Sequence, residues 1–274
     1  MRIDSHQHFW RLDRGDYTWL TRDLAPIYRD FGPEDLRPFL DRHDIAGTVL
    51  VQAAATVAET DYMLSLAAAC DFIRGVVGWV DFEAPDAVAQ ITRLAANPKL
   101  KSFRPMIQDI ADPEWMLRPS LQPAIRALMA RDLAFDALLK PPHLAPFRQF
   151  LKLYPKLRIV VDHGAKPNIA AGAFADWAVA MPAIAADPRV VCKLSGLVTE
   201  ARPDWQAADL RRYLDLLLAS FGADRLMWGS DWPVVNLAGG YDRWRQVTMD
   251  YVAELSEAEQ DAILGRTALA FYRL

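Results

Sequence analysis

The sequence predicts an α/β protein, a single-domain (β/α)8 TIM barrel, and three observations lead to this prediction. Eight short apolar runs alternate with helix-like stretches along the chain. Most of these runs are continuously apolar, which is typical of parallel strands covered by helices. The length of 274 residues is close to that of an ordinary barrel of this class. A doubly wound open sheet is the alternative, but no glycine-rich phosphate turn follows the first predicted strand.

The predicted elements follow one another in a regular order. The strands are expected at Ile3–His8, Gly47–Gln52, Gly75–Val80, Ser102–Ile107, Ala134–Leu139, Arg158–Asp162, Val190–Leu194 and Arg225–Trp228. The helices are expected at Pro33–His43, Thr60–Asp71, Ala84–Ala96, Pro119–Arg131, Pro142–Tyr154, Phe174–Ala186, Asp204–Phe221 and Tyr241–Leu255. An extra C-terminal helix is predicted over Ser256–Tyr272, because Ser256 and Glu259 have the form of a capping box. With no linker in between, residues 1–274 are predicted to form one domain.

The composition narrows the classes of function. Apolar residues make up 52% of the chain, charged residues 24%, and the net charge is −4. This lack of basic surplus argues against nucleic acid as a partner. No apolar run approaches the ~18 residues of a membrane span, and the polar start does not read as a signal peptide. Cys70 and Cys192 lie in apolar segments without C-x-x-C spacing, so a structural disulfide is not expected and the predicted location is the cytoplasm. The expected assembly is a monomer or homodimer.

Four residues are candidates for a metal centre. His6 and His8 lie two apart on the first strand, so strand alternation places both imidazoles on one face. His163 and Asp231 follow the sixth and eighth predicted strands. Because the C-terminal ends of all barrel strands meet at one mouth, these four side chains are expected to converge. Three imidazoles and a carboxylate can bind Zn²⁺ with a position left open for water, and Asp231 could instead act as a general base.

Six further side chains are candidates for substrate binding: Arg104, Lys193, Gln52, Trp19, His143 and Trp232. The two cations could bind a carboxylate or hydroxyl group, or stabilise an oxyanion. Trp19 lies in the long aromatic segment Phe9–Phe31 after the first strand, on the side where barrel active sites form. Each of these residues could instead pack a loop or lie at the surface. Asp4 and Asp162 are expected to point away from the mouth, toward the helices.

Five segments together resemble one known superfamily. They are Asp4–Trp10, Asp162–Pro167, Cys192–Leu197, Gly229–Pro233 and Gly265–Tyr272. Their sequences and order are similar to those of the amidohydrolase superfamily. The closest branch is the amidohydrolase-2 group of sugar-lactone hydrolases, which includes enzymes of the L-fuconolactonase and L-rhamnonolactonase type. The resemblance spans essentially the whole chain.

The resemblance implies a barrel that opens a sugar-acid lactone to the free aldonic acid. Asp231 would be the general base and His163 its catalytic partner, with one divalent metal, Zn²⁺ by preference, held by His6, His8, His163 and Asp231. Turnover without metal is the alternative within this branch. Superfamily members with the complete set of metal ligands have a further histidine at the end of the seventh strand, where this chain has Lys193-Leu194-Ser195. The chain also has no clear candidate for the carbamylated lysine of two-metal members. A binuclear site is therefore not expected. A metal-dependent decarboxylase or amide hydrolase, a lactone isomerase and a non-catalytic binding barrel are the other readings.

Overall fold

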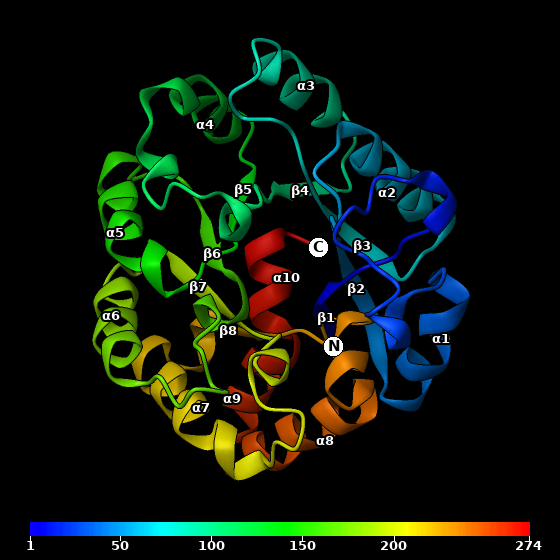
Figure 1. Cartoon of the computed structure of the whole chain (residues 1–274), viewed down its shortest axis with the longest axis vertical. Coiled ribbons are helices and arrows are strands. Elements are labelled where there is room, and N and C mark those ends of the chain that lie inside the picture. The colour runs from blue at the N-terminus through cyan, green and yellow to red at the C-terminus, as the bar shows by residue number, and fades with distance from the viewer.

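The eight strands of the protein form one parallel barrel. The computed structural model describes residues 1–274, and its strand order is β1 to β8 in sequence (Figure 1). The strands are β1 (Arg2–Gln7), β2 (Ile45–Val51), β3 (Ile73–Gly78), β4 (Leu100–Phe103), β5 (Ala134–Ala137), β6 (Ile159–Val161), β7 (Val190–Leu194) and β8 (Leu226–Trp228). The barrel closes where the His8 N–H donates to Trp232 O (2.7 Å) and the Asp231 N–H donates to His6 O (2.8 Å). The predicted fold class is therefore confirmed.

A helix follows each strand and covers the outside of the barrel (Figure 1). These helices are α1 (Pro33–Arg42), α2 (Val57–Ala69), α3 (Ala87–Leu94), α4 (Gln122–Ala130), α5 (Leu144–Leu153), α6 (Ala175–Ala185), α7 (Ala207–Phe221) and α8 (Gly240–Val252). Each overlaps a predicted helix, with bounds that differ by a few residues. No helix combines the length and the apolar character needed to cross a membrane.

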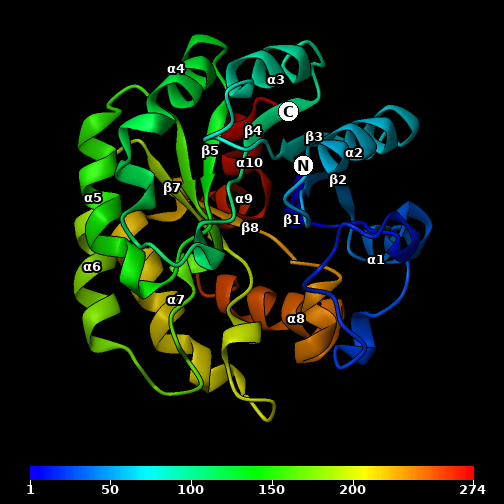
Figure 2. The ribbon, with the colours of Figure 1, turned by 45° about the horizontal axis from the view of Figure 1, so that its top comes forward.

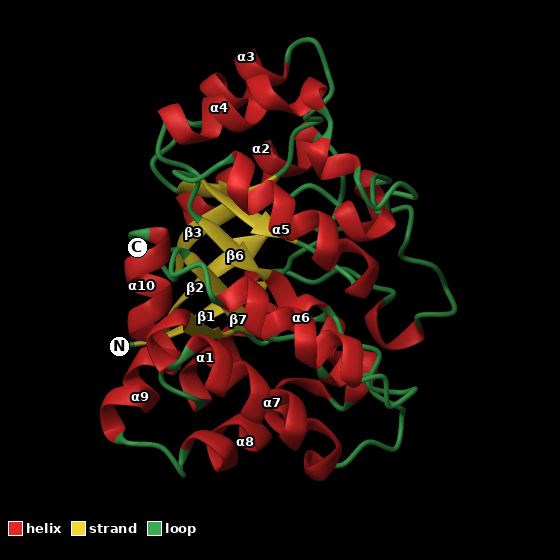
Figure 3. Cartoon of the chain, turned by 90° about the vertical axis from the view of Figure 1, so that its left-hand side faces the viewer, coloured by secondary structure: helices red, strands yellow, loops and turns green.

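The C-terminal segment differs from its prediction as a single helix. Its start is as expected, because Glu259 Oε2 accepts hydrogen bonds from the backbone N–H and the hydroxyl of Ser256. The helix is then interrupted by a π-helical turn, so that α9 (Glu257–Asp261) and α10 (Thr267–Tyr272) are separate elements. In Figure 1, α10 lies in the centre of the ring of strands, and Figure 3 shows it near the N-terminus. The helix thus plugs the end of the barrel where β1 begins.

The barrel interior has an apolar layer beneath a polar one. The apolar layer consists of inward side chains from the strands together with three from the C-terminal plug: Ile3, Val49, Val51, Val77, Ala134, Val160, Val191, Met227, Ala268, Phe271 and Tyr272. Two residues further along their strands, the next inward positions are Asp136, Asp162 and Lys193, all fully buried. The strand period of two therefore builds a charged layer between the plug and the mouth.

The expectation that Asp162 points away from the mouth is wrong. Its carboxylate faces the barrel interior, with Oδ1 3.0 Å from Lys193 Nζ. The error arose because His163 was taken as the inward residue of the pair, whereas Val160 is inward and alternation turns Asp162 inward as well. Asp4 does point outward, since its carboxylate accepts a hydrogen bond from the hydroxyl of Tyr241 on α8 (3.3 Å).

The long segment Phe9–Phe31 is ordered by its aromatic residues. Trp10 and Phe31 pair through two backbone hydrogen bonds, which close its base. The Trp19 ring packs edge-to-face on the buried Trp10 ring with centroids 5.5 Å apart, and its Nε1–H donates to Ala53 O (2.7 Å). Figure 2 shows this segment in dark blue between β1 and α1. It therefore holds Trp19 against the loop that follows β2.

Candidate active site at the barrel mouth

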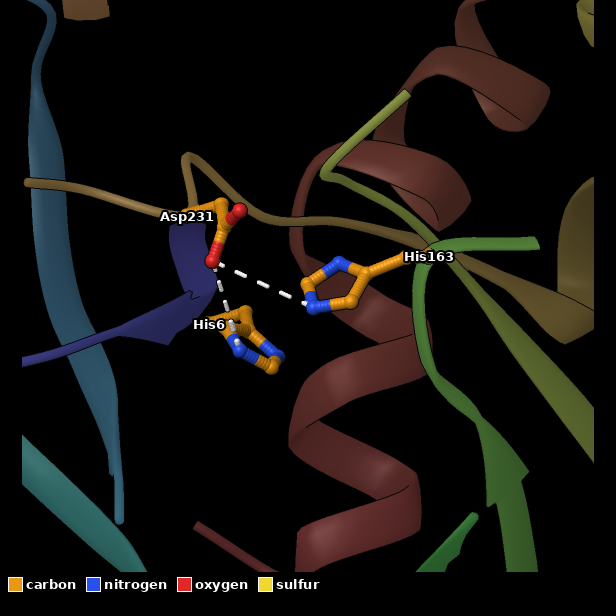
Figure 4. Close-up of side chains that lie close together, drawn as sticks. All are labelled: His6, His163 and Asp231. Carbon is orange, nitrogen blue, oxygen red and sulfur yellow. Dashed lines mark ion pairs between the residues drawn. The ribbon is translucent and has the colours of Figure 1, made fainter. Parts of the chain in front are cut away.

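Three imidazoles and one carboxylate meet at the C-terminal ends of the strands. His6 Nε2 lies 3.2 Å from His8 Nε2, and Asp231 Oδ1 lies 3.2 Å from the same His8 atom. His6 Nε2 and His163 Nε2 are 3.7 and 3.9 Å from Asp231 Oδ1. Figure 4 shows how His6 and His163 both face Asp231. The structure thus brings together all four residues that the sequence pointed to.

Unusual backbone conformations place two of these side chains. His163 (φ 55°) and Asp231 (φ 58°) both have left-handed conformations, which cost about 1–3 kcal/mol each for a residue other than glycine. The turn at His163 lets its ring reach the mouth although Asp162 before it points inward. Gly196 makes room for that ring, because a Cβ there would lie 2.4 Å from His163 Nδ1. Gly229 does the same for His6, whose Cβ would lie 2.6 Å from an added methyl carbon.

The Nδ1 atoms of His8 and His163, which point away from Asp231, each have a hydrogen-bond partner. His8 Nδ1 lies 2.7 Å from Val51 O, and because a carbonyl oxygen only accepts, Nδ1 carries the hydrogen. His163 Nδ1 lies 2.8 Å from Ser195 Oγ. Burial lowers the pKa of His6 and His8, and it lowers the pKa of His163 to about 4. All three imidazoles are therefore neutral at neutral pH.

Asp231 is the ionised member of the site. Burial acts to raise the pKa of its carboxyl group, but the neighbouring histidines, His163 first, outweigh it because they carry positive charge in the acidic range where this carboxyl group titrates. The net result is a pKa well below the usual range of an aspartate. The carboxylate is therefore charged across the neutral range.

The donor set fits a divalent cation. One ligand atom each from His6, His163 and Asp231 lies within 4.8 Å of the others. Neutral His8, with its hydrogen on Nδ1, presents a lone pair at Nε2 only 3.2 Å from the charged Asp231 oxygen. Two acceptors this close repel each other unless a proton or a cation lies between them. Imidazole nitrogens and a carboxylate are ligands that Zn²⁺ prefers.

A buried ion-pair network lies directly beneath this set. Lys193 Nζ is 2.7 Å from Asp136 Oδ2, 3.0 Å from Asp162 Oδ1 and 3.1 Å from His6 Nδ1. Asp136 also accepts hydrogen bonds from Ser102 Oγ (2.5 Å) and from the Tyr272 hydroxyl (2.6 Å). The Lys193 ammonium is fully buried and does not line the pocket. The structure therefore places this predicted substrate ligand behind His6.

Arg104 reaches the mouth from the end of β4. Its Nη1 lies 3.4 Å from both His6 Nε2 and Asp162 Oδ2. Its Nη2 donates to the backbone oxygen of Gln52, and Gln52 Nε2 donates to the Arg104 carbonyl oxygen (2.9 Å). Gln52 is fully buried and does not line the pocket, so it holds the arginine in place.

A pocket of about 320 Å³ opens above these residues. Its lining comes from loops after six strands: His8, Trp19, Leu24, Ala53, Arg104, Met106, Gln108, Asp109, Leu138, His163, Lys166, Asp231, Val234 and Leu237. The predicted Trp19 and Arg104 are among them. The sequence analysis did not single out the apolar members or Lys166 as pocket residues. Their positions in the loops that follow the strands were the signal that could have found them.

Two other predicted substrate ligands lie outside the pocket. Trp232 is buried against Phe9 and Phe31, with ring centroids 5.9 and 5.2 Å away. His143 is buried, and its Nδ1 accepts a hydrogen bond from the Lys140 N–H (2.9 Å) at the start of a helical turn. Both side chains have structural partners that account for their positions.

The fold and the site together define a barrel with a candidate metal centre at its mouth. The amidohydrolase family (Amidohydro_2) matches residues 3–274. The chain therefore belongs to the amidohydrolase family. The resemblance seen in the sequence motifs is confirmed over almost the full length.

Known relatives indicate which branch of the amidohydrolase family the chain resembles. The chain is 49% identical to the L-fucono-1,5-lactonase of Burkholderia ambifaria, over 98% of this chain and 91% of that one. It is 38% identical to the L-fucono-1,5-lactonase of Burkholderia multivorans, over 100% and 96% of the two chains. A crystal structure of a Burkholderia multivorans amidohydrolase with bound zinc superposes with a TM-score of 0.95, at 38% identity over 100% and 99% of the chains.

Proposed function

We propose that this protein hydrolyses a sugar-acid lactone of the L-fucono or L-rhamnono type to the free aldonic acid. The observation that carries the proposal is the meeting of His6, His8, His163 and Asp231 at one end of a small pocket, in a chain 49% identical to an L-fucono-1,5-lactonase. The pocket volume of about 320 Å³ suits a single sugar ring.

Asp231 is the proposed general base. It is ionised and lines the pocket, where it can accept a proton from a water molecule that attacks the lactone carbonyl. The protonated Asp231 can then return this proton to the ring oxygen as that oxygen leaves. His163 lines the pocket beside it and orients the water or the carbonyl group.

Arg104 is the proposed electrostatic partner of the developing oxyanion. Its guanidinium lines the pocket and lies 3.4 Å from His6 Nε2, so its charge is close to the reacting group. Because the Gln52 backbone already fixes its position, little reorganisation is needed during the reaction. Lys193 acts from behind His6 in this proposal, as a positioning residue.

The remaining lining supports recognition of a deoxy sugar. Trp19 offers an aromatic face for one side of the ring, while Met106, Leu138 and Val234 offer apolar contacts. Lys166 and Gln108 can hydrogen-bond to hydroxyl groups. This mixture suits a sugar that carries both hydroxyls and a methyl group.

One divalent metal, Zn²⁺ by preference, is the proposed cofactor. His6, His8, His163 and Asp231 would hold it, and a bound Zn²⁺ would lower the pKa of water and polarise a carbonyl group. The donor set described above and the zinc-bound relative support this assignment. Cys70 and Cys192 are free thiols, which supports the further proposal of a cytoplasmic enzyme. The proposed assembly is a monomer or homodimer.

The test is a pH-indicator assay with freshly prepared L-fucono-, L-rhamnono- and D-galactono-lactones, with and without chelator, corrected for spontaneous opening. Acid release well above the uncatalysed rate is expected for at least the first substrate, and the chelator arm determines whether metal is required. An aromatic carboxylic acid and an amide substrate serve as comparisons. Turnover of either one, with no lactone opening, would replace the proposal by a decarboxylase or an amide hydrolase.

A further inference from the structure

A fully buried carboxyl group lies behind the pocket wall and takes no part in the site described above. Glu59 is in the first turn of α2, and it is 0% exposed. Its Oε2 atom accepts a hydrogen bond from the Tyr17 hydroxyl (2.6 Å), and its Oε1 atom accepts one from the Ala53 N–H (3.2 Å). Glu59 itself does not line the pocket. One carboxyl group therefore joins the Phe9–Phe31 segment to the loop that follows β2.

Both partners of Glu59 lead directly to Trp19. The Ala53 carbonyl oxygen accepts a hydrogen bond from the Trp19 Nε1–H (2.7 Å), so Glu59 and Trp19 hold the two backbone polar groups of the same residue. Tyr17 opens the turn that contains Trp19, because the Leu20 N–H donates to the Tyr17 carbonyl oxygen (3.0 Å). Trp19 and Ala53 both line the pocket. The Trp19 ring is therefore tied to Glu59 by two separate routes.

A second set of contacts fixes Glu59 itself. The Thr56 hydroxyl, at the N-cap of α2, accepts a hydrogen bond from the Glu59 N–H (3.0 Å) and donates one to Asp16 Oδ2 (3.0 Å). Arg14 Nη2 lies 2.7 Å from that Asp16 oxygen and 3.7 Å from Glu59 Oε2. The Phe9–Phe31 segment and the start of α2 are thus joined in a closed network of side chains.

A carboxyl group is a costly choice for this position if packing is its only role. Burying an ionisable group loses solvation free energy, which an apolar side chain of similar size would keep. The helix does not need the Glu59 side chain as a cap either, because the Thr56 hydroxyl already accepts a hydrogen bond from the first turn. The carboxyl group adds two acceptor atoms, one for each segment that contributes a residue to the pocket wall.

We propose that Glu59 is a positioning residue for substrate binding, which holds Trp19 and Ala53 in the pocket wall without touching the substrate. The Trp19 ring is 37% exposed, and its orientation is fixed by the Ala53 oxygen and the Trp10 ring. Without Glu59 the wall would be less preorganised, so a sugar ring would bind more weakly. Glu59 makes no hydrogen bond or ion pair with the four residues of the candidate metal centre, so the chemical step should be unaffected. The inference rests on the proposed lactone substrate, whose ring Trp19 would contact.

Steady-state kinetics of lactone hydrolysis test this role. Glu59→Met keeps a similar volume but removes both acceptors, and it should raise KM about 3- to 10-fold while kcat stays within about twofold. Tyr17→Phe removes one of the two contacts and should give a smaller shift in the same direction. Glu59→Gln should restore KM, because its amide oxygen can accept from the Ala53 N–H while its amide nitrogen donates to the Tyr17 oxygen.

Tyr251→Phe is the matched control. It removes a tyrosine hydroxyl that donates to a carboxylate, that of Asp215 (3.1 Å), and neither residue lines the pocket. KM should not change in this variant. An unchanged KM in Glu59→Met, a loss in kcat as large as the rise in KM, or an equal effect of Tyr251→Phe would overturn the proposal.

The route through Trp19 is tested by combining substitutions. In a Trp19→Ala background the ring that Glu59 positions is gone, so Glu59→Met should raise KM by less than about twofold more. Effects of the two substitutions that simply multiply would show that Glu59 does not act through Trp19.

A second measurement needs no lactone. Trp19 is the most exposed of the nine tryptophans, so it contributes strongly to the quenching of fluorescence by acrylamide. Quenching should increase in Glu59→Met and in Tyr17→Phe but not in Tyr251→Phe, and the increase should vanish when Trp19→Phe is added. Unchanged quenching would overturn the positioning role even if lactone is turned over. Increased quenching without lactone turnover would support the role of Glu59 while refuting the substrate. If Glu59→Met does not fold, Tyr17→Phe decides the question in both assays.

Discussion

A methyl group added at Gly196 should damage the site through His163. The new Cβ of Gly196→Ala would lie 2.4 Å from His163 Nδ1, about 1 Å inside ordinary van der Waals contact, which begins at 3.4 Å. Gly196 also has φ +60°, which costs an alanine about 1–2 kcal/mol. Overpacking adds about 1–3 kcal/mol, so the free energy of unfolding should fall by about 2–5 kcal/mol in total.

The predicted loss of activity is larger than the loss of stability alone would cause. Moving the imidazole by about 1 Å breaks its 2.8 Å contact with Ser195 Oγ, and kcat/KM should fall about 100-fold. Gly172→Ala is the matched control, because Gly172 has φ +66° but its nearest neighbour would be 3.7 Å away. Urea unfolding and lactone hydrolysis are measured for both variants. Equal activity of Gly196→Ala and Gly172→Ala would refute the claim that the absence of a side chain at Gly196 is needed to accommodate the His163 ring.

Three further predictions concern the loop, a buried carboxyl group and the plug. Trp19→Ala should raise KM about tenfold with a smaller effect on kcat, as steady-state kinetics will show, because the ring lines the pocket; an unchanged KM would exclude substrate contact. Burial raises the pKa of Glu59 to about 7, despite a 2.6 Å hydrogen bond from Tyr17. The folded state thus binds more protons than the unfolded state between pH 4.5 and 7, and stability is lost as the pH rises through that window. Glu59→Gln should remove up to roughly 3 kcal/mol of this loss, seen as a thermal midpoint that changes less than that of wild type from pH 5 to 8; parallel curves would contradict it. Tyr272→Phe removes a donor to Asp136 and should lower the free energy of unfolding by about 1–3 kcal/mol in urea titrations, and no change would show that the hydroxyl is not needed to hold the network.

The strands and the candidate metal ligands could be predicted from the sequence because both follow from the periodicity of the chain. Continuous apolar runs identified the strands, and the rule that strand ends meet at one mouth grouped His6, His8, His163 and Asp231. These inferences require only the positions of the strands and the knowledge that all eight run in the same direction.

Other features depend on contacts between distant segments, which periodicity does not encode. The inward orientation of Asp162 follows from where its strand ends, and β6 is only three residues long. The partners of Lys193 come from β1, from β5 and from the residue after β6, so its role behind His6 is not visible in its own strand. The π-helical turn at Ala262–Arg266 breaks a helix whose start the capping box predicted correctly.

The most direct test of the central claim compares the wild type with Asp231→Asn on fresh L-fucono-1,5-lactone, followed by proton release. The asparagine keeps the shape of the side chain but removes the charge and the ability to accept a proton. The account predicts fast release by the wild type and a rate for the folded variant close to spontaneous opening. A variant that retains wild-type turnover would show that Asp231 is not the general base.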